Sequence, residues 1–87
     1  MPDILTRIRR LREITNLSQD EVADKLNMTQ GAYSRLENGR TRLDLDRLEQ
    51  IASLYGFTRT ELLTCSSTDL VRKILERPDF IERMGGG

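Results

Sequence analysis

Residues 17–39 read LSQDEVADKLNMTQGAYSRLENG, and this stretch decides the fold. Its pattern predicts two short helices joined by a tight turn. Ser18 followed by Glu21 has the spacing of a capping box, in which each side chain accepts a backbone N–H of the other residue at a helix start. The apolar residues of this first helix fall on one face: Val22, Ala23 and Leu26. Asn27 then tolerates the left-handed backbone that stops a helix.

The second helix of this stretch carries polar side chains that have no core to face. Thr29 can cap it, and Asn38-Gly39 can end it. We expect it to bury its inward residues: Ala32, Tyr33 and Leu36. The positions left over are polar or small: Thr29, Gln30, Gly31, Ser34, Arg35 and Asn38. Because Gln and Arg can form paired hydrogen bonds with base edges in the major groove, the stretch predicts a DNA-reading helix-turn-helix.

The segment before this motif predicts a further helix over residues 3–14. Its apolar residues share one face: Ile4, Leu5, Ile8 and Leu11. The arginines between them point elsewhere. We expect Arg7 and Arg9 to be solvated, and Arg10 to be either solvated or in contact with a phosphate.

The segment after the motif predicts two more helices. The first spans residues 45–55, with Asp44 as its cap and Gly56 at its end. Its core stripe consists of Leu45, Leu48, Ile51, Ala52 and Tyr55. Thr58 and Glu61 form a second capping box. This opens a short helix that we expect to bury Leu62 and Leu63.

Several of these motifs resemble the helix-turn-helix of the Cro and lambdoid phage-repressor family, often called XRE-like regulators. They are Leu17-Ser18-Gln19, Val22-Ala23-Asp24-Lys25-Leu26, Met28-Thr29-Gln30 and Leu36-Glu37-Asn38-Gly39. The resemblance continues through residues 44–52 and 58–63, and covers roughly residues 4–64. It implies an all-α fold, with a five-helix DNA-binding domain in residues 1–65. Residues 66–84 fall outside the resemblance, and their own pattern predicts a C-terminal helical extension.

The resemblance also implies roles for individual residues. Gln19 would bond a phosphate and brace Gln30, which would read a base, most naturally adenine. Arg35 is the candidate for guanine, with Gly31 and Ser34 completing the reading face. At the position of Gly31 many relatives carry a longer, base-reading side chain, so here the position permits close approach instead.

Two further roles follow from the same resemblance. Asn38 would donate to a phosphate from the end of the reading helix. Arg12 would pair with Glu37 and thereby tie the first helix to the end of the reading helix. Asn27 stands where glycine is common in the turn; it is the next best residue for positive φ, so the fold is still expected.

The charge of the chain is unusual for a DNA-binding protein. The formal net charge is zero; residues 1–42 hold eight Lys/Arg against six Asp/Glu, and residues 43–87 hold six against eight. We therefore expect few phosphate contacts per protomer and an affinity that depends on pairing two protomers. Arg40 and Arg42 come directly after the reading helix. They are either exposed loop charges or, as we favour, phosphate contacts.

The C-terminal part of the chain carries an apolar stripe that the family pattern does not cover. Ser66 to Thr68 predict a hinge and a helix start, and Pro78 interrupts the helical pattern. The stripe consists of Leu70, Val71, Ile74, Leu75, Phe80, Ile81 and Met84. Since a five-helix domain would already have a closed core, we expect this stripe to form a homodimer interface and truncation after Ser66 to leave the domain folded. The alternative is that it folds back on its own domain. Residues 85–87 are expected to form a flexible tail.

Other chemistry finds little support in the sequence. A single Cys65 and the lack of histidine argue against a disulfide, a metal site and any cofactor. The chain has no nucleophile–base pair and no glycine-rich phosphate loop, so an enzyme is not expected. The absence of a leader or a long apolar run predicts a cytoplasmic protein without membrane contact.

Three hypotheses remain open from the sequence. The leading one is a sequence-specific regulator, most simply a repressor, that binds double-stranded DNA at a palindromic operator as a homodimer. The second is an antitoxin whose C-terminal segment binds a toxin protein. The third is a protein–protein adaptor that has lost DNA binding, which the zero net charge permits.

Overall fold

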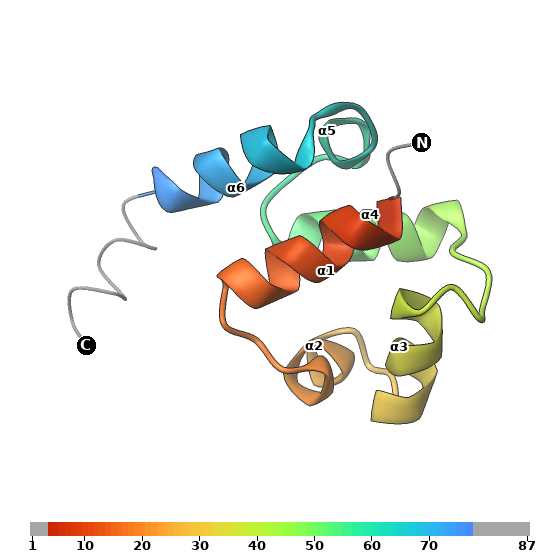
Figure 1. Cartoon of the computed structure of the whole chain (residues 1–87). Coiled ribbons are helices and arrows are strands. Elements are labelled where there is room, and N and C mark those ends of the chain that lie inside the picture. Colours follow the sequence, from red (N-terminus) through yellow and green to blue (C-terminus); the bar gives the residue numbers. More distant parts are fainter. Residues whose placement is uncertain (1–3, 78–87) are drawn as a thin grey trace.

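The computed structural model describes residues 4–77 of the chain, and these residues form helices joined by short turns (Figure 1). The helices are α1 (Ile4–Ile14), α2 (Gln19–Lys25), α3 (Gln30–Glu37), α4 (Leu45–Leu54), α5 (Arg59–Thr64) and α6 (Ser67–Leu75). The all-α prediction is confirmed. Residues 78–84, which include Phe80, Ile81 and Met84 of the expected interface, lie outside the described residues.

Polar caps set where the helices begin. From α2 onward, each helix starts after a side chain that accepts the N–H three residues later: Ser18, Thr29, Asp44, Thr58 and Ser66. Both expected capping boxes are present. The turns after α1 to α4 contain a residue with positive φ: Asn16, Asn27, Gly39 and Gly56. In each case the next residue donates its N–H to the carbonyl five residues back, at 2.8–3.1 Å, which closes the helix end.

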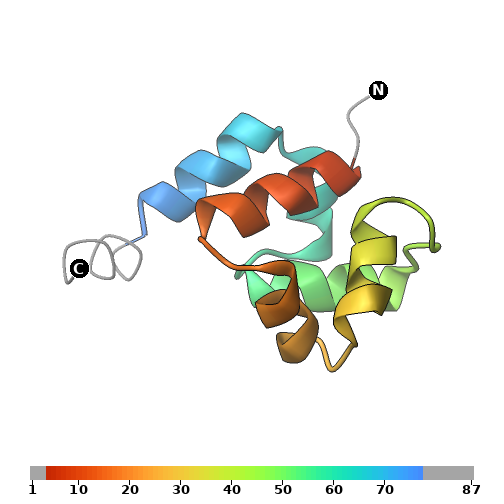
Figure 2. The ribbon, with the colours of Figure 1, turned by 60° about the horizontal axis from the view of Figure 1, so that its bottom comes forward.

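α1 lies between two layers in both ribbon views, with α6 on one side and α2 and α3 on the other (Figures 1 and 2). One apolar core joins these layers, and its largest fully buried side chains are Tyr33, Ile8, Leu11, Ile51, Leu62, Leu70 and Val22. The expected burial of Tyr33 is thus confirmed.

The position of α6 contradicts the expectation that its whole apolar stripe forms a homodimer interface. Leu70 and Ile74 are 0% and 2% exposed and belong to the same core as α1 to α5. Arg77, just beyond α6, donates to the Tyr55 carbonyl and lies 4.7 Å from the centre of the Phe57 ring. The core of the first five helices is therefore not closed without α6, and Leu70 and Ile74 cannot face a second protomer.

Three apolar residues that were expected to be buried are not fully buried. Leu45 is 61% exposed because it occupies the first position of α4, ahead of the turns that contact the core. Leu63 is 46% exposed, since short α5 turns only the side of Leu62 inward. Ala32 is half-buried rather than buried.

Two arginines stabilise the fold by donating hydrogen bonds to carbonyls at helix ends. Arg7, expected to be solvated, is 8% exposed and donates to the carbonyls of Leu62 and Leu63 at 3.1 and 2.7 Å. These carbonyls lie in the last turn of α5, where no intrahelical partner is available, and a cation there also complements the helix dipole. Arg47 donates to the carbonyl of Leu26 at the end of α2 in the same way.

Candidate DNA-binding surface

α3 divides into a buried side and a solvent-facing side. Tyr33 and Leu36 are 0% and 3% exposed and anchor the helix to the core. On the other side the predicted reading residues reach solvent: Gln30, Gly31, Arg35 and Asn38 are exposed and Ser34 is half-buried. Thr29 is exposed as well, and its hydroxyl accepts the N–H of Ala32 at 3.1 Å as the cap. The structure thus brings the predicted reading residues to one accessible helix.

Gly31 and Arg35 lie one helical turn apart and are spatially linked. A methyl group placed on Gly31 would lie 3.5 Å from Nη1 of Arg35, which is ordinary van der Waals contact. The guanidinium therefore extends over Gly31, in the direction that side chains on a helix usually take. Gly31 is itself exposed, so the surface at this turn of α3 is formed by the backbone and by the Arg35 guanidinium.

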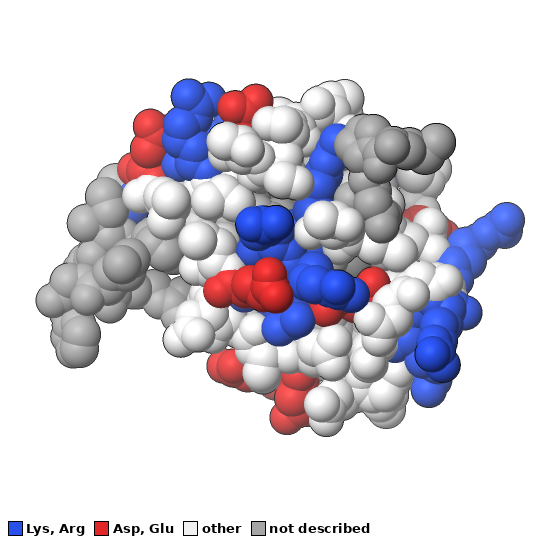
Figure 3. Space-filling view, in the orientation of Figure 1, with Lys and Arg blue, Asp and Glu red and all other residues white. Residues whose placement is uncertain are grey.

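The loop after α3 carries the exposed basic residues Arg40 and Arg42. Figure 3 shows basic side chains along the edge of the molecule where this loop runs in Figure 1. The exposed acidic residues of the motif lie on α2 instead: Asp20, Glu21 and Asp24. The two elements that flank α3 therefore differ in charge: the loop after it is basic, whereas α2, which packs against it, is acidic.

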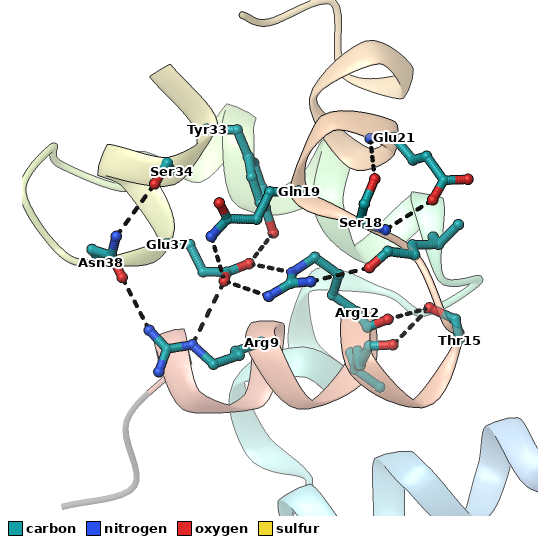
Figure 4. A network of polar contacts seen from close by, with 12 residues as sticks. Arg9, Arg12, Thr15, Ser18, Gln19, Glu21, Tyr33, Ser34, Glu37 and Asn38 are labelled. Carbon is teal, nitrogen blue, oxygen red and sulfur yellow. Dashed lines mark hydrogen bonds and ion pairs between the residues drawn. The ribbon is translucent and has the colours of Figure 1, made fainter. Parts of the chain in front are cut away.

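A buried carboxylate holds the end of α3 in place (Figure 4). Glu37 is 2% exposed and accepts two hydrogen bonds from Arg12, from Nε at 2.9 Å and from Nη2 at 3.0 Å. The hydroxyl of Tyr33 donates to it at 2.7 Å, and Nε2 of Gln19 at 3.2 Å. The predicted Arg12–Glu37 pair is confirmed, and it forms the centre of a network that joins α1, α2 and α3.

The network controls the ionisation of its members. Burial alone would raise the pKa of Glu37, but the hydrogen bonds from Arg12, Tyr33 and Gln19 outweigh it and hold that pKa below its usual value. Burial, together with the bond to Glu37, raises the pKa of Tyr33 far above its usual value. The bond to Glu37 also raises the pKa of Arg12. Glu37 is therefore charged, and Tyr33 a neutral donor, across the physiological range.

Two residues with expected phosphate roles have protein partners in this structure. The amide of Gln19 donates to Glu37, a partner that the sequence did not suggest. Asn38 accepts a hydrogen bond from Nη2 of Arg9 at 3.1 Å and donates to Oγ of Ser34 at 3.4 Å. The phosphate contacts of Gln19 and Asn38 remain predictions.

Arg9 is a residue of this site that the sequence reasoning missed. It was expected to be solvated; its side chain is 48% exposed, yet it reaches both Asn38 and Glu37. A signal was present in the sequence, because Arg9 and Arg12 lie one helical turn apart and must share a face of α1. The Tyr33–Glu37 bond has the same kind of signal, a spacing of four residues on α3.

Residues 4–64 match the family described as "Helix-turn-helix domain". The chain belongs to this family. It is 30% identical to the cryptic phage CTXphi transcriptional repressor RstR of Vibrio cholerae over 79 residues, covering 91% of this chain and 71% of that protein. It is 36% identical to the control protein C.MunI of a Mycoplasma species over 59 residues, covering 67% of this chain and 80% of that protein. No solved structure matches the chain.

The family match and these relatives together identify the protein as a DNA-binding regulator of the XRE-like helix-turn-helix type. Among residues 4–77, no helix is long and apolar enough to cross a membrane. The same residues contain no group of three or more metal-ligating side chains.

Proposed function

We propose that the protein is a transcriptional repressor that binds a palindromic operator as a homodimer. The observation that carries the proposal is the division of α3, whose inner side is fixed in the core while Gln30, Gly31 and Arg35 face solvent. Gln30 and Arg35 would read base edges, and Arg40 and Arg42 would bind the backbone. The similarity to a protein named as a transcriptional repressor supports the sign of regulation.

A dimer is expected from the small size of this reading surface. One protomer offers few phosphate contacts, and two protomers with reading helices about 34 Å apart would contact successive major grooves. The outer side of α6 is the candidate interface, because Leu75 is 40% exposed and lies with half-buried Val71 in a groove beside Arg10 of α1. The interface is thus expected at the outer part of the stripe, Val71 and Leu75, rather than at Leu70 and Ile74.

Selection of bound sequences from random duplex DNA with the full-length chain tests whether the protein recognises a specific, palindromic sequence. We expect an inverted repeat whose half-sites have centres about 10 base pairs apart. Enrichment of no sequence would contradict sequence-specific binding. An unrepeated site would contradict the dimer.

Sedimentation tests the interface separately. The full-length chain should be a dimer at tens of micromolar, and Leu75→Arg should convert it to a folded monomer with much weaker operator binding. Leu63→Arg is the matched control, since Leu63 is a similarly exposed leucine on α5. A wild-type monomer would overturn the dimer and favour the antitoxin hypothesis.

A further inference from the structure

Arg9 connects α1 to the end of the reading helix, although it lies outside the helix-turn-helix in sequence. Figure 4 shows its guanidinium between Asn38 and Glu37. Nη2 donates to Oδ1 of Asn38 at 3.1 Å, and Nε lies 3.6 Å from Oε1 of Glu37. The residue therefore contacts the position at which α3 ends and the basic loop begins.

The charge of Arg9 is not needed to neutralise Glu37. Arg12 already forms two short hydrogen bonds with that carboxylate, and the Arg12 side chain is only 15% exposed. Arg9 approaches Glu37 at the longer distance of 3.6 Å and remains 48% exposed. Of the two guanidinium groups that approach Glu37, Arg9 is therefore the one that remains accessible from solvent.

The contact with Arg9 also orients the amide of Asn38. Because Oδ1 accepts from Arg9, the amide nitrogen is turned the other way, where its hydrogen bond to Oγ of Ser34 is long at 3.4 Å. A primary amide has two N–H donors, so donor capacity remains on this exposed residue. A guanidinium beside an amide donor is an arrangement that suits an anionic phosphate oxygen.

The surroundings place this pair of donors next to the expected path of the DNA backbone. A methyl group on Gly39 would lie 3.2 Å from Cδ1 of Leu5, so the N-terminal half of α1 packs against the start of the loop that carries Arg40 and Arg42. Arg9 lies one turn after Leu5 on the same helix. It thus extends the basic edge formed by that loop.

We propose that Arg9 binds a DNA phosphate beside Asn38 and holds the Asn38 amide in its donating orientation. This makes α1 a DNA-contacting element in addition to α3 and the loop after it. The inference rests on the proposed function, since it needs DNA on the face of α3.

The test compares Arg9→Gln, Arg9→Lys and a control, Arg59→Gln, on the selected operator and on random duplex DNA across a range of salt concentrations. Arg59 is an exposed arginine on α5, which packs mainly against α4 and α1, and its loss changes the net charge equally. Arg9→Gln should weaken binding to both DNAs on the order of tenfold and reduce the salt slope by about 0.9 per protomer. Arg9→Lys should keep the slope, and Arg59→Gln should bind like the wild type.

A second measurement separates binding from folding. The thermal midpoint of Arg9→Gln should stay close to that of the wild type, because a half-exposed ion pair contributes little to stability. In an Asn38→Ala background, Arg9→Gln should cost less affinity than in the wild type, since the positioning contribution is already lost. Unchanged affinity, or weaker binding with an unchanged salt slope and a lowered midpoint, would overturn the role of Arg9. A wild type that binds no DNA would instead overturn the proposed function.

Discussion

The two sides of α1 are held by different forces. Toward α3, Arg9 and Arg12 meet a buried carboxylate in a network of short polar contacts. Toward α6, the contact is mainly apolar and depends on Leu70 and Ile74 fitting into the core. The polar side fixes the orientation of α3, whereas the apolar side supplies the buried area that an 87-residue chain needs in order to fold.

Removal of α6 should give the largest effect and would test the apolar side. Truncation after Ser66 exposes the core where Leu70 and Ile74 were buried, so we expect the shortened chain to be unfolded by circular dichroism. Leu70→Ala should cost about 2–5 kcal/mol of unfolding free energy, whereas Leu63→Ala, at an exposed leucine, should cost less than about 1 kcal/mol. If the truncated chain is folded and unfolds cooperatively, α6 is not a required part of the core but a separate extension.

Loss of the buried carboxylate should come next and would test the polar side. Glu37→Gln leaves the Arg12 guanidinium without its counter-ion at a largely buried position, and we expect a loss of about 3 kcal/mol in denaturant unfolding. Asp69→Asn is the control, because it breaks an ion pair whose side chains are 64% and 48% exposed. That change should cost less than about 1 kcal/mol. Equal costs for the two variants would contradict the special role of the buried network.

The pH dependence of stability offers a gentler way to weaken the same network. Because the pKa of folded Glu37 lies below its ordinary value of 4.5, the folded state binds fewer protons than the unfolded state near that pH. The contribution of Glu37 is therefore complete above about pH 4.5 and is lost as pH falls through the depressed pKa. Between pH 7 and pH 3, the unfolding free energy should therefore change less with pH for Glu37→Gln than for the wild type. Parallel pH profiles would show that Glu37 is not the responsible group.

The two sides also differ in how far the sequence could predict them. Caps such as Ser18 and Thr58, and the left-handed residue Asn27, depend on neighbours within one turn, and the sequence predicted them correctly. The family resemblance supplied the Arg12–Glu37 pair. By contrast, the apolar stripe of α6 predicts that this face of the helix is buried, but it does not predict whether the same domain or a second protomer buries it. Likewise, Arg7 could not be placed, because its acceptors are carbonyls 55 and 56 residues away.

A small change on the reading face should separate stability from recognition. Gly31→Ala adds a methyl group at ordinary contact distance from Arg35, and alanine favours a helix over glycine. We expect unfolding free energy to rise by about 0.5–1 kcal/mol while the base preference or the operator affinity changes. Ser53→Ala, at an exposed position of α4, is a control that should leave DNA binding unaltered. A more stable Gly31→Ala protein with unchanged DNA recognition would show that DNA does not approach this turn of α3.

The central claim is that the outer side of α3 reads base sequence, and Arg35 tests it most directly. The measurement is a selection of bound sequences from random DNA, performed in parallel with the wild type and Arg35→Ala. We predict that the variant retains the half-site but loses its preference at one guanine position per half-site, at a cost of about 1–3 kcal/mol. Identical preferences at every position in the two selections would contradict the claim and place the reading face elsewhere.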